Sequence, residues 1–205
     1  MLKQRALHPL YKMLEIPIVY HITQQIGRPT TNRYRKLMIT NLPTSSGQRI
    51  LDLGCGLGAY RDCFAQNYTG IDINPAYVER ARLTLPGRFE TMDCTDLQFP
   101  DRSFDEVVTV ATTHHLDDAQ VVKMVEEALR VCEPRGHFHI IDAILPVSEN
   151  SIFKTFWFRL DRGRFPRELS HLLMLARRTG NVVHHEVLTG PLHDTVYVRV
   201  GRAQA

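Results

Sequence analysis

The chain has 205 residues, which suits one domain with a terminal extension. Its formal net charge of +3 is too small to indicate a nucleic-acid partner. We expect no signal peptide and no membrane span, because no apolar run reaches about 18 residues. The four cysteines form no C-x-x-C pair, so we expect neither a disulfide framework nor a metal site, and a reduced cytoplasmic location.

Residues 1–45 are expected to form an N-terminal helical segment. Pro9 and Pro17 break its first part into one or two short helices around 9–26, and a further helix is expected at 31–41. We expect this segment to act as a lid over a site in the rest of the chain.

Strands and helices are predicted to alternate in the middle of the chain. Apolar runs predict strands, and helical spacing of apolar residues predicts helices between them. The expected strands are 49–53, 68–73, 88–92, 104–111 and 137–143, and the expected helices are 58–66, 75–84 and 118–131. This alternation indicates an α/β fold: a doubly wound, mostly parallel sheet with helices on both faces.

The last third of the chain departs from that alternation. Residues 150–179 are expected to form one or two helices. Two β-rich stretches, 181–189 and 195–200, follow and are separated by Gly190 and Pro191. Because a short turn joins them, we expect an antiparallel strand pair that closes the sheet.

Three glycines at alternate positions, Gly54, Gly56 and Gly58, follow the first predicted strand. Glycine tolerates positive φ and lets a ligand approach the backbone closely. The second predicted strand ends in Asp72, which is 72 − 54 = 18 positions after Gly54. This spacing is typical of nucleotide-type sites in which a carboxylate accepts hydrogen bonds from a ribose. The glycine pattern alone also fits a dinucleotide-binding fold.

Four further segments follow the glycine loop in a fixed order. The five segments are Leu51-Asp-Leu-Gly-Cys-Gly56, Asp72-Ile-Asn-Pro75, Met92-Asp-Cys94, Asp101-Arg-Ser-Phe-Asp105 and Glu127-Ala-Leu-Arg-Val-Cys-Glu-Pro-Arg-Gly136. Over residues 48–142 the chain resembles the class I S-adenosylmethionine (SAM)-dependent methyltransferases, in particular their small-molecule, type 11 branch. The resemblance implies a Rossmann-like fold, SAM as cofactor and S-adenosylhomocysteine (SAH) as product.

The resemblance also implies which residues bind the cofactor. The glycine loop would hold the methionine half, Asp72 the ribose, and Asp93 with the following amide the adenine, against which Ile73 would pack. Each role has an alternative: a tight turn without a ligand for the glycine loop, a helix cap for Asp72, a turn acid for Asp93 and a core side chain for Ile73. The full expected set is Asp52, Leu53, Gly54, Gly56, Gly58, Asp72, Ile73, Asp93, Cys94, Thr95 and Ala111.

Two adjacent histidines, His114 and His115, follow the fourth predicted strand. In the resembled group this loop lies beside the sulfonium and the methyl acceptor, and histidine titrates near neutral pH, so either could act as a general base. The alternative is that both only shape the pocket. Neighbouring side chains in extended backbone point opposite ways, so we expect only one histidine to face the site.

The acceptor side of the site is expected in residues 145–205, with the cofactor-binding core in 48–142. Asp142, at the end of the fifth strand, is a candidate to face the acceptor. A basic cluster suggests a small-molecule acceptor with an anionic group, although a solvated helix face explains it as well. The cluster comprises Arg159, Arg162, Arg164 and Arg167.

Three other functions compete with small-molecule methylation at oxygen, nitrogen or carbon. A nucleic-acid methyltransferase is disfavoured because residues 112–115 lack the Asn/Asp-Pro-Pro-aromatic segment of base-amino methylation, and because the net charge is low. An NAD-dependent oxidoreductase would share the glycine loop but leaves the Asp93 segment unexplained. A SAM-binding protein without catalysis also fits. The sequence fixes neither the acceptor nor the oligomeric state.

Overall fold

The computed structural model describes residues 31–42, 47–64, 67–146, 164–190 and 193–203. Contacts divide the chain into two units, Met1–Arg33 and Tyr34–Ala205. The helices predicted around 9–26, most of the helical stretch predicted at 150–179, and Arg159 and Arg162 lie outside the described residues.

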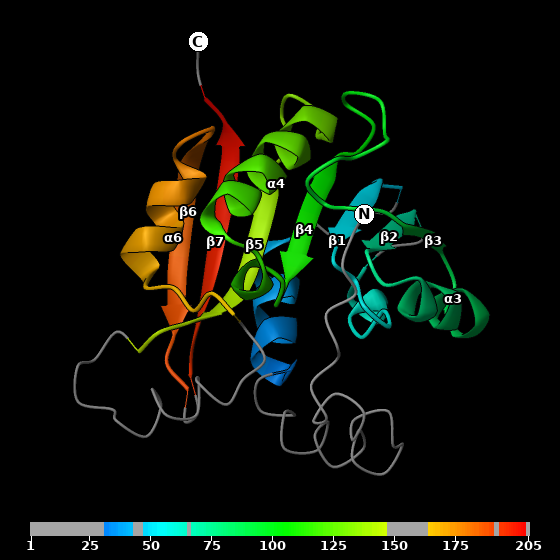
Figure 1. Ribbon diagram of the computed structural model, residues 1–205, viewed down its shortest axis with the longest axis horizontal. Coiled ribbons are helices and arrows are strands. Elements are labelled where there is room, and N and C mark those ends of the chain that lie inside the picture. Colours follow the sequence, from blue (N-terminus) through cyan, green and yellow to red (C-terminus); the bar gives the residue numbers. More distant parts are fainter. Residues whose placement is uncertain (1–30, 43–46, 65–66, 147–163, 191–192, 204–205) are drawn as a thin grey trace, which may run out of the picture. The chain divides into compact units, whose positions relative to one another are not determined.

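A seven-stranded sheet in the order β3-β2-β1-β4-β5-β7-β6 forms the centre of the second unit (Figure 1). The central strands are short, mostly apolar runs, as the sequence predicts. The strands are β1 (Ile50–Leu53), β2 (Tyr68–Asp72), β3 (Arg88–Thr91), β4 (Glu106–Val110), β5 (Phe138–Ile144), β6 (Gly180–Leu188) and β7 (Asp194–Arg202).

The first five strands run parallel to one another, and β7 runs in the opposite direction. β1 pairs with β2 and β4, β2 with β3, and β4 with β5, all in parallel. β7 lies antiparallel to both β5 and β6, with a bulge between Val182 and His184. The predicted doubly wound sheet with its antiparallel C-terminal pair is therefore confirmed.

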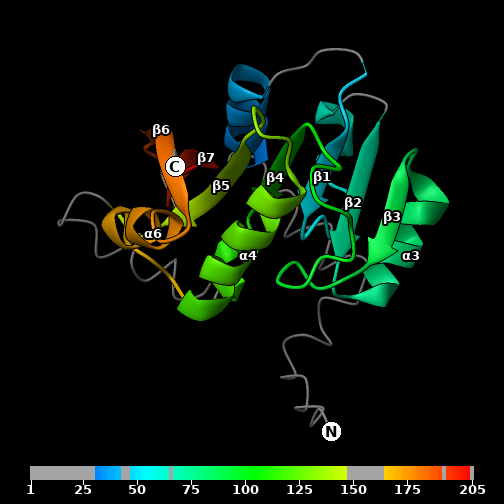
Figure 2. The ribbon, with the colours of Figure 1, turned by 90° about the horizontal axis from the view of Figure 1, so that it is seen from above.

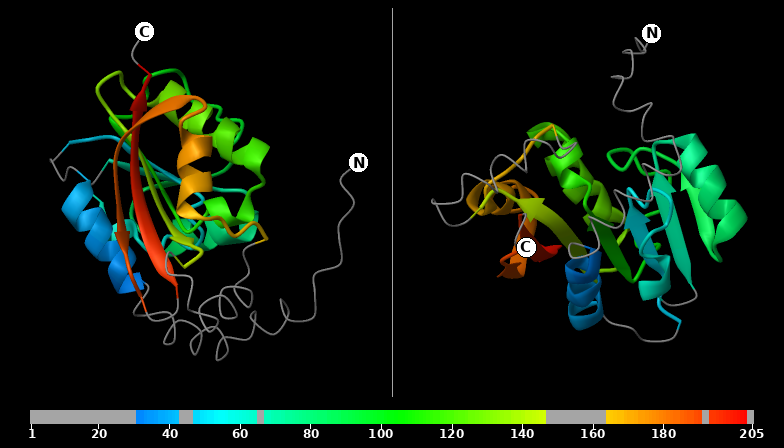
Figure 3. Two further views of the ribbon diagram at one scale, coloured as in Figure 1. Left: turned by 90° about the vertical axis from the view of Figure 1, so that its left-hand side faces the viewer. Right: turned by 90° about the horizontal axis from the view of Figure 1, so that it is seen from below.

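The two faces of the sheet carry separate apolar clusters. On one face, α4 (Asp118–Val131) and α6 (Leu169–Ala176) bury residues such as Val125 and Leu172. On the other face, the helical residues 31–41 and α3 (Pro75–Thr84) contribute side chains such as Leu37 and Val78. Figure 2 shows α4 and α6 across the sheet from the helical residues 34–41, and the left panel of Figure 3 shows the same layers edge-on.

Capping side chains fix the starts of two helices. Asn74 caps α3 by accepting from the Ala76 amide, and Pro75 takes the first helical position. Asp117 caps α4 in a reciprocal capping box with Gln120. Both caps fix helix starts just after loops that carry candidate site residues.

The helix predicted at 58–66 is wrong over its described part. Gly58 has φ +75°, which a right-handed helix does not allow, and only a three-residue 3-10 turn, η1 (Arg61–Cys63), follows it. Arg35, from the helix at 31–41, donates to the Ala59 carbonyl at 2.8 Å and so occupies an acceptor that a helix here would have used. The fourth strand is also shorter than predicted, since Phe104 makes only an isolated bridge with Cys132.

Candidate active site

The candidate residues lie at or just beyond the carboxyl ends of β1, β2, β3 and β4, or near that end of β5. In an open parallel sheet this is the edge where ligands bind, at the point where the strand order reverses. Here the reversal falls between β1 and β4, which are adjacent strands although they are not consecutive in sequence. The glycine loop after β1 and the histidine loop after β4 are therefore neighbours.

The three glycines of the loop have distinct surroundings. All have positive φ, at +76° for Gly54, +56° for Gly56 and +75° for Gly58. A Cβ on Gly54 would lie 2.5 Å from the Thr112 hydroxyl, and one on Gly58 would lie 2.4 Å from Leu85. A Cβ on Gly56 would meet nothing within 4 Å. Gly56 is thus the glycine that borders open space, as a cofactor cradle requires.

Asp72 ties the end of β2 to this loop. One carboxylate oxygen accepts from the Gly56 amide at 2.9 Å, and the other accepts from the Asn74 amide at 2.8 Å. The next side chain, Ile73, is 70% exposed, which is unusual for isoleucine. A carboxylate fixed by backbone donors, beside an uncovered apolar side chain, fits the ribose and adenine of SAM.

The third strand end contributes Asp93, which is exposed. Its Oδ1 accepts from both the amide and the hydroxyl of Thr95, at 2.8 and 2.7 Å, and this turn fixes the carboxylate. Burial raises the pKa of the neighbouring Cys94 to about 12, so this cysteine stays a thiol. The adenine role predicted for these three residues fits their place and stays a prediction.

Asp52 and Leu53 lie inside β1 and not in the loop. Leu53 is fully buried, and its carbonyl accepts from the Thr109 hydroxyl at 2.8 Å. The Asp52 carboxylate is buried and accepts from the Tyr68 hydroxyl at 2.8 Å. Burial raises the pKa of Asp52 to about 7, although the Tyr68 hydrogen bond opposes this. The structure thus makes Asp52 a buried acid beneath the loop.

Ala111, the first residue after β4, has φ +54°. Left-handed backbone is uncommon for a residue with a Cβ, and such strain often accompanies functional sites. The conformation turns the chain from β4 into the loop that carries the histidines.

His114 and Asp142 form a buried pair. Nδ1 of His114 lies 2.6 Å from a carboxylate oxygen of Asp142, and both side chains are less than 10% exposed. Asp142 also accepts from the Thr113 hydroxyl and from the Ala143 amide, the latter at 2.7 Å. Burial would raise the pKa of Asp142, but the His114 charge and these hydrogen bonds outweigh it, and the pKa is lowered. Asp142 is therefore a carboxylate at neutral pH.

His115 is placed differently from the prediction. Residues Thr113–His115 form a 3-10 turn, η2, and not extended backbone. The two histidine rings consequently lie side by side, with centroids 4.1 Å apart, and do not point opposite ways. His114 is buried and His115 exposed, so the structure separates the two candidates by burial.

The sequence left Arg167 either in an anion-binding cluster or on a solvated helix face, and its burial and contacts fit neither. Arg167 is 5% exposed, and its guanidinium donates to the carbonyls of Thr113 and Leu116 and to the Asp118 carboxylate. Arg164 is exposed. Burial of Arg167 was not visible in the sequence, because its partners lie about fifty positions away.

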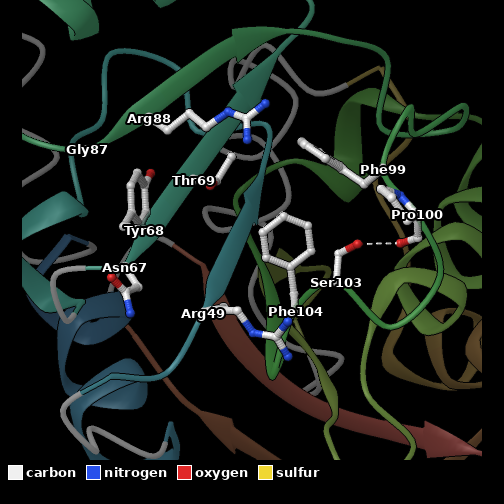
Figure 4. A pocket seen from close by; sticks show the side chains of 10 residues that line it. All are labelled: Arg49, Asn67, Tyr68, Thr69, Gly87, Arg88, Phe99, Pro100, Ser103 and Phe104. Atoms are coloured by element: carbon white, nitrogen blue, oxygen red, sulfur yellow. Dashed lines mark hydrogen bonds between the residues drawn. The ribbon is translucent and has the colours of Figure 1, made fainter.

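A cavity of about 520 Å³ lies elsewhere, at the amino ends of β1, β2 and β3 (Figure 4). Phe99 and Phe104 form one wall, in edge-to-face contact with ring centroids 5.0 Å apart. Arg49, at its rim, is engaged by Asp105 and Glu133. This cavity is at the opposite edge of the sheet from the residues described above and holds none of them.

In the part of the chain that the structure describes, the side chains form no candidate metal site and the helices no membrane span. No group of three or more His, Cys, Asp or Glu side chains there is arranged to hold a metal ion. Among the helices of those same ranges, none has the length and apolar character to cross a membrane.

The fold and site define a class of protein that solved structures share. A SAM-dependent methyltransferase from Methanosarcina mazei superposes with a TM-score of 0.66 at 18% identity, covering 82% of this chain and 98% of that one. At this identity the match shows the fold alone, which is the Rossmann-like fold of class I methyltransferases.

Sequence relatives then identify the family. Residues 51–140 match the family model described as a methyltransferase domain, type 11. An uncharacterized methyltransferase from Synechocystis is 30% identical over 139 residues, covering 64% of this chain and 66% of its own length. The 27-O-demethylrifamycin SV methyltransferase of Amycolatopsis mediterranei is 36% identical over 126 residues, covering 56% and 46%. The chain belongs to the type 11 branch of the class I SAM-dependent methyltransferases.

This assignment implies SAM as the cofactor and replaces the dinucleotide alternative that the glycine pattern left open. The matches span about half to two thirds of the length of these curated relatives.

Proposed function

We propose that the protein transfers a methyl group from SAM to a hydroxyl oxygen of a small molecule, with His114 as the general base. The observation that carries this proposal is the 2.6 Å contact between Nδ1 of His114 and Asp142. A histidine held in this way by a carboxylate is arranged to accept a proton at its other ring nitrogen, Nε2. An acceptor needs such a base only if it keeps its proton until attack, as a hydroxyl does.

Four residues would hold the cofactor. Gly56 borders the space for the methionine half, Asp72 would accept from the ribose hydroxyls, and Asp93 with Ile73 would contact the adenine. When bound, SAM supplies an electrophilic methyl group on a sulfonium. The residues of the chain must then hold the acceptor oxygen in line with the methyl–sulfur bond, and such alignment is worth about 7–11 kcal/mol in well-oriented reactions.

The His114–Asp142 pair accounts for the proton. SAM would supply the methyl group, and Nε2 of His114 would take the proton that the acceptor hydroxyl gives up on methylation. The imidazolium that results is stabilised by the adjacent Asp142 carboxylate, whose lowered pKa keeps it ionised. Asp142 is thus a positioning residue that also balances the charge.

Two observations bear on the acceptor. The relative from A. mediterranei is named for methylation of an oxygen on a small molecule, and this supports the same class of acceptor here. Arg167, part of the basic cluster behind the anionic-acceptor hypothesis, is committed to backbone carbonyls and Asp118. We therefore favour an uncharged hydroxyl compound over an anionic one.

The test is methyl transfer from isotopically labelled SAM to a panel of phenols and aliphatic alcohols, with bulk tRNA as a competing substrate. The proposal predicts a methyl ether as product and a rate lower by about 10²–10⁴-fold in His114→Gln. His115→Gln, a change of the same chemistry on the neighbouring exposed residue, is the matched control and should keep most of the rate. Labelling of RNA, or full turnover by His114→Gln on a hydroxyl acceptor, would overturn it.

A further inference from the structure

Arg167 holds the loop that carries His114 from the side of α4 and α6. It lies just before α6, and its side chain is 5% exposed. Nη1 donates to the Thr113 carbonyl at 2.7 Å, and Nη2 donates to the Leu116 carbonyl at 2.6 Å. The Arg167 guanidinium therefore binds the backbone on both sides of His114 and His115.

The segment around Arg167 adds two backbone contacts. The Phe165 amide donates to the His114 carbonyl at 3.0 Å, and the Leu145 amide donates to the Arg167 carbonyl at 2.9 Å. The first contact fixes the backbone of His114 itself. The second joins the same segment to the residue that follows β5, two positions beyond Ala143, whose amide binds Asp142. One short segment thus connects the two strands that supply the His114–Asp142 pair.

Arginine suits this task for a physical reason. Within the 3-10 turn Thr113–His115, the Thr113 carbonyl accepts from the Leu116 amide at 3.1 Å, and Arg167 supplies it with a second donor. The Leu116 carbonyl lies beyond the turn and takes its donor from Arg167, and buried carbonyls without donors are costly. Guanidinium offers five donors in a rigid plane, whereas an ammonium is a flexible point donor. Asp118 accepts from Nε and Nη2 of Arg167 at 3.0 and 2.8 Å and neutralises the buried charge.

We propose that Arg167 is a positioning residue for His114: its fork sets the conformation of residues 113–116 and so keeps the His114 ring against Asp142. This inference rests on the proposed role of His114 as base. It assigns to Arg167 a part in the reaction without contact to substrate or cofactor.

The chain offers a matched control at the other end of α4. Arg130 also donates to two backbone carbonyls, of Leu97 and Phe99, and to an acid of α4, Glu127. The two arginines make the same kind of contacts, but only Arg167 reaches the histidine loop. Loss of the fork at Arg130 should therefore lower stability without affecting His114.

The experiment compares Arg167→Lys with Arg130→Lys by nitrogen-15 NMR of the histidine rings, which needs no acceptor. The His114 signals are assigned from their absence in His114→Gln, and SAH binding confirms that each variant is folded. We expect wild type to show the Nδ1-protonated tautomer at His114. In Arg167→Lys we expect loss of that bias and at least tenfold faster amide exchange at residues 114–116, with Arg130→Lys matching wild type.

Unchanged His114 signals in a folded Arg167→Lys protein would overturn the proposal, as would equal disturbance in Arg130→Lys. If Arg167→Lys does not fold, Asp118→Asn takes its place, because it weakens the contacts of the same guanidinium. This variant should shift the His114 signals in the same direction, and a wild-type spectrum would overturn the proposal. The readout also separates the two proposals. If His114→Gln kept full turnover, His114 would not be the base. The effect of Arg167 on the His114 ring would still be measured by NMR, because that readout needs no acceptor.

Discussion

Nδ1 of His114 and the carboxylate of Asp142 lie 2.6 Å apart, 28 positions apart in sequence. The pair joins the loop after β4 to β5, the adjacent parallel strand. Because one ring nitrogen is committed to Asp142, proton exchange with an acceptor is assigned to the other. His115, by contrast, is exposed.

Asp142→Asn should lower kcat while leaving SAH affinity close to wild type. The amide keeps the size of the side chain but can present an NH₂ group to Nδ1, which favours the wrong histidine tautomer. We expect a loss of about 10²–10⁴-fold in kcat, as for removal of general-base catalysis, measured by steady-state kinetics on the identified acceptor. A fall in SAH affinity of similar size would instead show that Asp142 serves the cofactor.

Gly56→Ala should weaken SAH binding in a protein that still folds. The added Cβ meets no protein atom within 4 Å, so it projects into the space assigned to the cofactor. The left-handed φ of +56° costs alanine about 1–2 kcal/mol of stability, which a folded domain tolerates. Calorimetric titration with SAH measures the affinity, and urea unfolding measures the stability.

Gly58→Ala is the control for that change, because its φ of +75° imposes comparable strain. Its Cβ would press on Leu85 at 2.4 Å instead of entering open space. It should therefore lower the unfolding free energy at least as much as Gly56→Ala and affect SAH affinity less. The reverse order of affinities would place the cofactor elsewhere on the loop.

Asp52→Asn should change how stability depends on pH. Burial raises the pKa of Asp52 from 3.8 to about 7, so the folded protein binds this proton more tightly than the unfolded chain does. The free energy of unfolding of wild type therefore falls as pH rises from about 4 to about 7, and asparagine, which does not titrate, removes that loss.

Urea unfolding of the ligand-free protein at pH 5 and pH 8 measures this effect. The stability of Asp52→Asn relative to wild type should increase by about 2–3 kcal/mol between the two pH values. A difference that is the same at both pH values would mean that Asp52 is ionised throughout.

Local patterns were sufficient for the sheet and for the loops at its carboxyl edge. Apolar runs predict β1 to β5 within one or two residues, and the turn at Gly190 predicts the antiparallel pair of β6 and β7. The glycines of the loop stand where the backbone has positive φ, a conformation that residues with a Cβ rarely adopt. These features depend on neighbours in the chain, which is why they could be predicted.

The details that govern the proposed chemistry depend on distant partners. The η2 turn replaces extended backbone where Arg167 supplies donors from about fifty positions away, and it brings the rings of His114 and His115 together. The helix expected after Gly58 is likewise replaced where Arg35 takes the Ala59 carbonyl. No periodicity of the sequence encodes contacts of this kind.

The most direct measurement is calorimetric titration of the protein with SAH, in wild type and in Asp72→Ala, with thermal unfolding to confirm that both are folded. The account predicts wild-type binding with a dissociation constant on the order of micromolar. It predicts at least about 100-fold weaker binding in the variant, because two hydrogen bonds to a carboxylate are lost. No binding by folded wild type, or equal binding by Asp72→Ala, would contradict it.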